Sequence, residues 1–157
     1  MSTNKKRYLV LCTGNRCRSQ MAHGWLAHLG GEAVEVFSAG TKPKGVHPLS
    51  IEVMREAGVD ISCHTSDLLD QYLEESFDAV VTVCDHAKEA CPVFPGANRT
   101  VHHAFDDPDN PALAASDPEA LRRVFCRVRD EVRDWCGAFL ESEGVTPAAL
   151  RPGDQSQ

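Results

Sequence analysis

The hydrophobic pattern of this chain alternates between short apolar runs and amphipathic stretches. Runs typical of buried strands predict β-structure at residues 8–11, 34–39, 77–83 and 100–103. Apolar positions at helical spacing predict helices at residues 19–29, 48–57 and 116–139, with shorter helical turns in 66–75. Strands that alternate with helices favour a parallel sheet, so we expect an α/β fold with a four-stranded parallel sheet and helices on both faces.

Cap signals indicate where two of these helices begin and end. Ser19 lies where the first helix would be capped, and Gly30-Gly31 would end that helix. Ser116-x-x-Glu119 is the pattern of a capping box for the last helix, with Pro118 in its first turn.

Length and composition are those of one soluble globular domain. The 157 residues are 42% apolar and 25% charged, and from Gly144 onward the chain is polar with glycine and prolines. We therefore expect a single domain over residues 1–143 and a flexible tail over 144–157. The formal net charge of −7 argues against nonspecific binding to nucleic acid or to an acidic membrane.

The beginning of the chain does not have the pattern of an export signal. Only four apolar residues separate the basic start from Cys12, and no stretch is long enough to span a bilayer. We expect a cytoplasmic protein. In that reducing compartment an odd number of cysteines favours catalytic or metal chemistry over a disulfide scaffold. The seven cysteines are Cys12, Cys17, Cys63, Cys84, Cys91, Cys126 and Cys136.

The segment Cys12–Ser19 has the pattern of a strand end, a tight loop and a helix start. Loop amides and the helix dipole would converge on one point and favour a bound anion. A cysteine at that point is expected to be a thiolate, and Arg18 would add a planar fork suited to a tetrahedral oxyanion. The pattern predicts a thiolate nucleophile in an oxyanion-binding loop made of Thr13, Gly14, Asn15, Arg16, Cys17 and Arg18. The alternative is a buried structural cysteine with a solvated Arg18.

Two further groups follow strands that should end at the same edge of the sheet. Cys84 comes after the third strand, and Asp106-Asp107 follows the fourth. An acid is needed there because oxygen leaves a tetrahedral oxyanion slowly unless it is protonated. On the residues alone, the two aspartates could equally be turn residues before Pro108.

The pair Cys84 and Cys91 has no role in a simple ester hydrolysis. Two thiols seven residues apart, one at a strand end and one in a polar loop, suit thiol–disulfide exchange that carries oxidation outward from Cys12. A zinc site with His86 or His102-His103 is the alternative, but the usual two-residue cysteine spacing is missing. Purely structural cysteines are another.

The first motif resembles a known family. Cys-Thr-Gly-Asn-Arg-Cys-Arg-Ser-Gln-Met-Ala at 12–22, with Asp-Asp-Pro at 106–108, resembles the low-molecular-weight protein tyrosine phosphatase superfamily over residues 7–140. The resemblance implies that family's four-stranded fold. It also implies a nucleophile, an oxyanion-binding arginine, a serine bonded to the nucleophile's sulfur and a general acid, at Cys12, Arg18, Ser19 and Asp107.

Four more motifs resemble one branch of that superfamily, the thioredoxin-coupled arsenate reductases. They are the cysteine pair followed by proline, Gly-Trp after the first loop, and Ser-Ala-Gly and His-Thr-Ser-Asp at 38–40 and 64–67. The resemblance implies that arsenate is reduced to arsenite through a Cys12–Cys84 and then a Cys84–Cys91 disulfide. Thioredoxin would be the external reductant, with no bound cofactor, and we expect a monomer. The alternatives are a tyrosine phosphatase and a non-enzymatic redox sensor.

Two positions depart from the pattern of that branch. Some members bind potassium through an asparagine, a glutamate, a serine and an aspartate. Asn15, Ser38 and Asp67 match, but His23 stands at the glutamate position, so we expect no metal site. Arg16, where family members often have a small residue, would either strengthen anion attraction or point to solvent.

Overall fold

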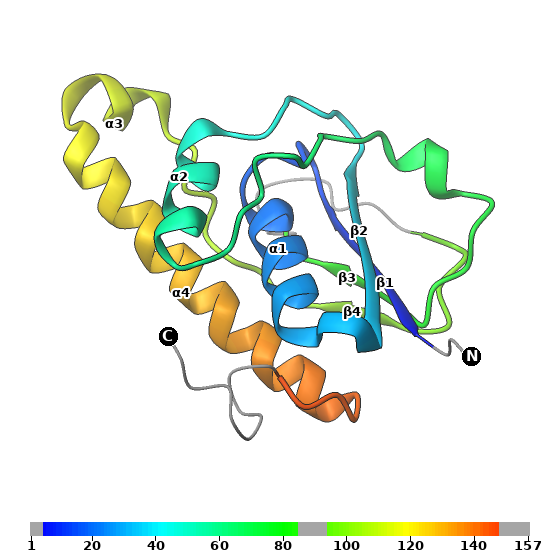
Figure 1. The fold of residues 1–157 in the computed structure, drawn as a ribbon. Helices are drawn as coiled ribbons and strands as arrows, with labels where there is room; N and C mark the ends of the chain where they lie inside the picture. The colour runs from blue at the N-terminus through cyan, green and yellow to red at the C-terminus, as the bar shows by residue number, and fades with distance from the viewer. Residues whose placement is uncertain (1–4, 85–93, 148–157) are drawn as a thin grey trace.

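Within residues 5–84 and 94–147, which the computed structural model describes, four parallel strands form one sheet in the order β2-β1-β3-β4 (Figure 1). Most residues of the central strands β1 and β3 are apolar, because both faces of these strands are covered. The parallel sheet predicted from the sequence is confirmed. The strands are β1 Lys6–Cys12, β2 Val34–Gly40, β3 Ala79–Thr82 and β4 Thr100–His102.

The described α-helices pack against one face of the sheet, and the other face is covered by a 3₁₀ turn and irregular segments (Figure 1). Side chains of β1 alternate between the faces: Tyr8 and Val10 pack with α1, α2 and α4, whereas Leu9 and Leu11 face the short turn η2. The helices are α1 Arg18–Gly30, α2 Pro48–Glu56, α3 Pro111–Ser116 and α4 Pro118–Ser142, with single 3₁₀ turns η1 Gly31–Ala33 and η2 Leu69–Tyr72.

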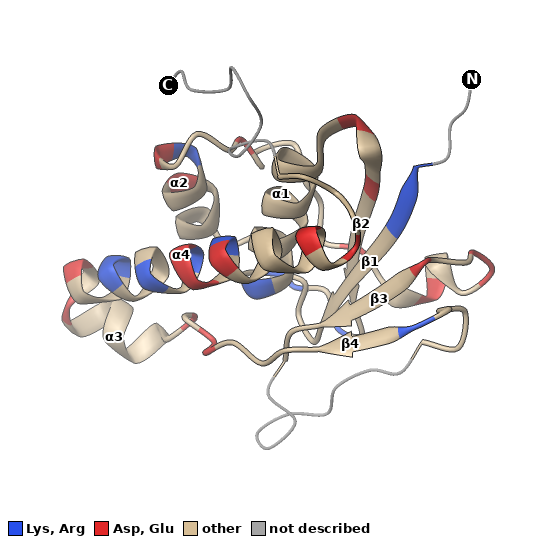
Figure 2. Ribbon diagram, turned by 90° about the horizontal axis from the view of Figure 1, so that it is seen from below, with Lys and Arg blue, Asp and Glu red and all other residues tan. Residues whose placement is uncertain are grey.

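The long helix α4 contributes more buried side chains than any other helix to the core on the face it shares with α1. Its stripe of Phe125, Val128, Val132 and Cys136 is fully buried, and each large apolar side chain contributes about 1.5–3 kcal/mol by leaving water. Basic and acidic residues alternate along its outer side (Figure 2). This division is what the periodicity of the sequence predicts.

Two of the predicted helix caps are wrong. Ser116 is the last residue of α3, a helix that the sequence pattern did not indicate, and Asp117 caps α4 by accepting a bond from the Ala120 amide at 3.1 Å. Asp117 has a non-helical backbone, as an N-cap requires, whereas Ser116 is helical. Ser19 lies inside the first turn of α1, which follows Cys17, because its hydroxyl is engaged elsewhere.

The carboxyl ends of β1, β3 and β4 meet at one edge of the sheet. The Val83 amide bonds the Leu11 carbonyl at 3.1 Å, and the Phe105 amide bonds the Val83 carbonyl at 3.3 Å. This ladder brings the segments that follow the three strands together, as the topology predicted.

At the other end of the fold, Val145 is buried against α4, and residues 148–157 of the predicted tail lie outside the described residues. No helix in 5–84 or 94–147 is long and apolar enough to cross a bilayer.

Gly40, at the end of β2, lies directly against the loop that follows β1. A Cβ there would overlap the Thr13 carbonyl oxygen and lie 3.0 Å from both the Asn15 nitrogen and the Cys12 oxygen. Because these are backbone atoms, we expect Gly40→Ala to lower the free energy of unfolding by about 1–3 kcal/mol, measured by urea denaturation.

Gly137→Ala is the matched control, because a Cβ on that residue of α4 meets nothing within 4 Å. It should raise stability by about 0.5–1 kcal/mol, as alanine does in a helix interior. Equal stability of the wild type and Gly40→Ala would contradict the close approach.

Candidate active site

The loop between β1 and α1 forms the floor of a cavity of about 140 Å³. The cavity brings together the predicted nucleophile, arginine and acid. It also includes Lys44 and Asp109, which sequence reasoning missed because nothing in their spacing links them to the loop. Its lining is Cys12, Thr13, Gly14, Arg16, Cys17, Arg18, Lys44, Asp107 and Asp109.

The sulfur of Cys12 lies 3.0 Å from the Ser19 hydroxyl oxygen. The side-chain amide of Asn15 donates to the same oxygen at 2.8 Å. Since an amide nitrogen can only donate, Ser19 accepts from Asn15 and its own hydrogen is left for the sulfur. A hydroxyl that donates to sulfur stabilises a thiolate, which is the role that the family resemblance implied for Ser19.

The backbone of Asn15 is in the left-handed region, with φ of 48°, and its side chain is fully buried. Asparagine tolerates this conformation better than most residues. Bonds from other segments hold it: the Asp67 amide donates to its Oδ1 at 2.9 Å, and Gln20 and Ser66 both donate to its carbonyl oxygen. The loop is therefore shaped by contacts with the chain around residues 65–67.

Arg18 is 4% exposed at the start of α1, and its guanidinium lies 3.5 Å from Asp107. Asp107 reaches the cavity from the segment after β4, and its side chain is half exposed. The amide of Asp109 donates to Asp107 Oδ1 at 3.0 Å. The structure thus places the predicted acid at the mouth of the cavity whose floor holds Cys12.

Cys84 follows β3 and is fully buried. Leu11 pairs with Thr82, so Cys12 and Cys84 leave the sheet at the same edge on neighbouring strands. Cys84 is disulfide-bonded, whereas the other cysteines of the described chain are free. Cys91, predicted as its partner, lies in residues 85–93, outside the described part of the chain.

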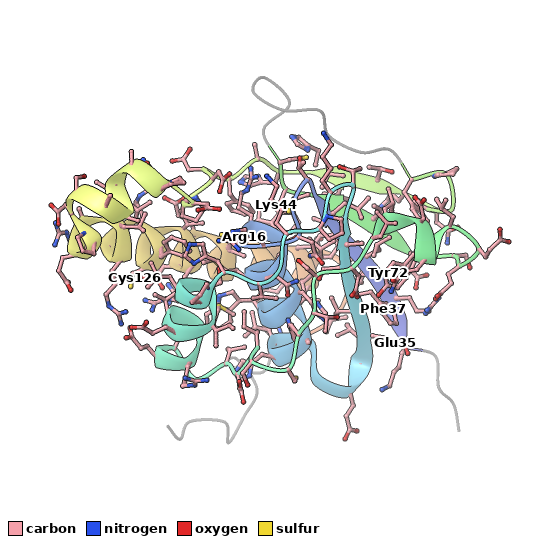
Figure 3. The ribbon with its side chains drawn as sticks, turned by 90° about the horizontal axis from the view of Figure 1, so that it is seen from above. Arg16, Glu35, Phe37, Lys44, Tyr72 and Cys126 are labelled. Carbon is pink, nitrogen blue, oxygen red and sulfur yellow. The ribbon has the colours of Figure 1, made fainter. Side chains whose placement is uncertain are left out.

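Arg16 lines the cavity, and contacts with other segments hold its side chain. Its Nε donates to Asp109 Oδ2 at 2.8 Å, and its NH1 donates to the carbonyls of Lys44 and Gly45 at 3.4 and 3.3 Å. Figure 3 shows Arg16 beside Lys44, where the loop meets the segment after β2. A sequence separation of 93 residues hides the contact with Asp109 from any local pattern.

His23, at the position where the family resemblance places a glutamate, is a neutral structural group. His23 Nδ1 lies 2.9 Å from the Ser38 hydroxyl, and its ring stacks on His64 with centroids 4.1 Å apart. Burial, and then the neighbouring His64, lower the pKa of His23 to about 3. A charged imidazole is therefore excluded from this position near neutral pH.

The residues that match the family's potassium ligands do not fit a cation here. Oδ1 of Asn15 accepts from the Asp67 amide, and the two oxygens of Asp67 accept from Thr65 and Tyr72 at 2.7 and 3.1 Å. The carboxylate that the ion would need is replaced by His23. Across the part of the chain that is described, no three histidine, cysteine or acidic side chains gather to hold a metal.

Beside Cys12 and Cys84, the structure describes four cysteines, of which Cys17 lines the cavity. Cys17 packs under the loop, where burial raises the pKa of its thiol to about 12, and burial also raises the pKa of the core residue Cys136. Cys63 is exposed. Cys126 is half-buried on α4 and is labelled in Figure 3.

Comparison with known proteins identifies the fold family. The family model for low molecular weight phosphotyrosine protein phosphatases matches residues 7–148. This chain belongs to that family. The arsenate reductase of Halalkalibacterium halodurans is 46% identical to this chain over 88% of this chain and 98% of its own length.

Solved structures extend the likeness of this phosphatase-family chain. A structure of an arsenate reductase in its phosphate-binding state is similar with a TM-score of 0.72 and 30% identity, covering 87% of this chain and 98% of that one. The thioredoxin-dependent arsenate reductase of Corynebacterium glutamicum is similar with a TM-score of 0.64 and 26% identity, covering 90% of this chain and 65% of that one.

Ser19→Ala should make Cys12 a weaker nucleophile. The change removes the hydroxyl that lies 3.0 Å from the sulfur, so the thiolate loses one stabilising hydrogen bond. We expect alkylation of Cys12 by iodoacetamide at pH 7 to slow by about tenfold, the equivalent of one such bond. Ser62→Ala, on an exposed turn, is the control. An unchanged alkylation rate in Ser19→Ala would show that the hydroxyl does not serve the sulfur.

His23 should make the fold sensitive to acid. Its folded pKa, about 3, lies below the ordinary value of 6.5, so the unfolded chain binds the proton more readily. Its contribution is complete above pH 6.5 and is lost as pH falls toward 3. As pH falls from 6.5 to 5, we expect His23 to lower the free energy of unfolding by about 2 kcal/mol. The variant His23→Gln should not show this decrease. Urea denaturation of both proteins at the two pH values measures this, and parallel curves would contradict a neutral His23.

Proposed function

We propose that this protein is a cytoplasmic arsenate reductase that converts arsenate to arsenite with electrons from thioredoxin. Relatives named arsenate reductases, 42–46% identical over 83–88% of this chain, support the substrate. The observation that carries the proposal is Cys84, a buried, disulfide-bonded cysteine beside the strand that bears Cys12. Hydrolysis of a phosphate ester has no use for a second cysteine there.

Arsenate is a tetrahedral oxyanion and binds in the loop as phosphate would. The amides that precede and begin α1 point toward the bound oxygens, and the helix dipole adds to their attraction. The guanidinium of Arg18, almost fully buried, holds its charge in a low-dielectric setting where it attracts the anion strongly. Binding places the central atom of the anion above the sulfur of Cys12.

The first chemical step exchanges an oxygen for sulfur on arsenic. The Cys12 thiolate attacks arsenic(V) while Asp107 protonates the departing oxygen, which leaves as water after a second proton is taken up. This step is a substitution and not a reduction, because arsenic remains in the +5 state. Ser19 holds the thiolate before the attack.

The second step is the reduction. The Cys84 thiolate attacks the sulfur of Cys12, and the sulfur–arsenic bond breaks with its electron pair going to arsenic. Arsenic leaves as arsenite in the +3 state, and two thiols have become the Cys12–Cys84 disulfide. Cys91 then attacks Cys84, freeing Cys12 and forming Cys84–Cys91. The thioredoxin dithiol reduces that disulfide and is itself oxidised.

The state of Cys84 supports this relay. A disulfide on Cys84 with Cys12 free is the arrangement expected after the oxidation has moved outward and before thioredoxin acts. The thioredoxin-dependent relative from Corynebacterium glutamicum supports the choice of reductant.

Cys91→Ser should separate one turnover from many. With arsenate, thioredoxin, thioredoxin reductase and NADPH, we expect this variant to release about one arsenite per enzyme molecule and then to stall. Peptide mapping without reductant should find Cys12 joined to Cys84. Cys63→Ser, an exposed free cysteine, is the matched control and should cycle normally.

Three outcomes would contradict the relay. Normal cycling by Cys91→Ser means that another thiol resolves the intermediate. Hydrolysis of an aryl phosphate by the wild type without arsenate reduction, unaffected by loss of Cys84 or Cys91, indicates a phosphatase. No turnover of either substrate, with a Cys84 disulfide that persists in Cys12→Ser, indicates a redox sensor.

A further inference from the structure

The ion pair between Arg16 and Asp109 joins three segments around the cavity. Arg16 belongs to the oxyanion loop, Asp109 to the segment after β4, and the guanidinium also bonds the carbonyls of Lys44 and Gly45. The side chains of Arg16 and Asp109 are 29% and 27% exposed, so the pair is partly shielded from water and from salt. Their bond links the oxyanion loop to the segment that carries the acid.

The second oxygen of Asp109 faces the start of α2. It lies 3.6 Å from Nε2 of His47. Nδ1 of His47 accepts from the Leu49 amide at 3.0 Å, so the ring hydrogen is on Nε2, toward the carboxylate. Burial, and then the positive Arg16, lower the pKa of His47, which keeps the ring neutral. The His47 amide donates to the Arg16 carbonyl at 3.2 Å, which ties the same helix end to the loop.

The backbone of Asp109 orients the acid. Its amide donates to Asp107 Oδ1 at 3.0 Å, while the other oxygen of Asp107 lies 3.5 Å from Arg18. Packing does little to hold Asp107, because 51% of its side chain is exposed. The carboxylate of Asp109 is anchored, and its amide bonds Asp107. Asp109 therefore sets the position of the Asp107 side chain.

We propose that Asp109 is a positioning residue, whose ion pair with Arg16 holds the acid Asp107 over the oxyanion loop. The inference rests on the proposed role of Asp107 as proton donor. Asp109 also compensates the charge of Arg16, so its loss has two separable effects. The acid moves and the chemical step slows, while an uncompensated guanidinium at the cavity wall attracts the anion more strongly.

The two partners are therefore expected to change anion affinity in opposite directions. Asp109→Ala leaves Arg16 unpaired and should tighten binding of inorganic phosphate severalfold. Arg16→Ser leaves Asp109 unpaired and should weaken it by a similar factor. Both should slow the chemical step by about tenfold, since each breaks the same tether. A merely structural role would weaken phosphate binding in both variants.

The test uses the full chain and two measurements. Arsenite released in a single turnover at saturating arsenate, without thioredoxin, gives the chemical rate. Protection of Cys12 from iodoacetamide gives the dissociation constant of inorganic phosphate. Asp109→Asn still accepts a hydrogen bond from Arg16. Its chemical rate and its phosphate dissociation constant should therefore lie between those of the wild type and those of Asp109→Ala. The double variant should be no slower than either single one, because the second change removes nothing more.

Asp70→Ala, an exposed acidic residue on η2 across the sheet, controls for the loss of one negative charge. A wild-type rate in Asp109→Ala, additive losses in the double variant, or parallel loss of rate and phosphate binding would each overturn the proposal. Asp107→Asn distinguishes its failure from that of the mechanism: if Asp107→Asn is slow and Asp109→Ala is fast, only the positioning role is wrong.

A wild type that reduces no arsenate would disprove the proposed function but still leave a test of the tether. Hydrolysis of phenyl phosphate then replaces arsenate reduction, because its leaving oxygen also needs a proton. The same order of rates among the variants is expected. Absence of both activities, or the same rate in Asp107→Asn as in wild type, overturns the positioning role together with the acid it serves.

Discussion

The hydrogen bond from Asn15 to Ser19 is the contact on which the rest of the site depends. It ties a buried residue with left-handed backbone to the first turn of α1, and leaves the hydroxyl of Ser19 to serve the sulfur of Cys12. A left-handed non-glycine residue costs about 1–2 kcal/mol, so it persists only where other bonds offset the cost. Here those bonds come from Gln20 and the segment 66–67. Residues outside the loop therefore determine its conformation.

Charge balance within the cavity is the second constraint. The chain carries a net charge of −7, yet the cavity is lined by Arg16, Arg18 and Lys44 against Asp107 and Asp109. Local excess of positive charge, reinforced by the helix start, is what draws an anion into an acidic protein. The pairing of Arg16 with Asp109 keeps that excess modest and gives the acid-bearing segment a fixed point of attachment.

The region behind the loop is held by neutral groups. Where the family resemblance places a carboxylate, His23 supplies a neutral ring that bonds Ser38 and stacks on His64. A neutral hydrogen bond and ring packing thus hold α1 against β2. The expected consequence is a dependence of stability on acid rather than on a cation.

Local pattern alone determined the sheet, the principal helices and the order of the chemical groups along the chain. Cys12, Arg18 and Asp107 were identifiable because strand ends, helix starts and the family motif are short-range features, and the parallel topology carries them to one edge. The tertiary structure alone decided which partner each polar side chain takes. Ser19 bonds sulfur instead of capping α1, Asp117 caps α4 in place of Ser116, and Arg16 pairs with a residue 93 positions away. Such choices depend on distances between segments that are remote in sequence, and those distances exist only once the core has packed.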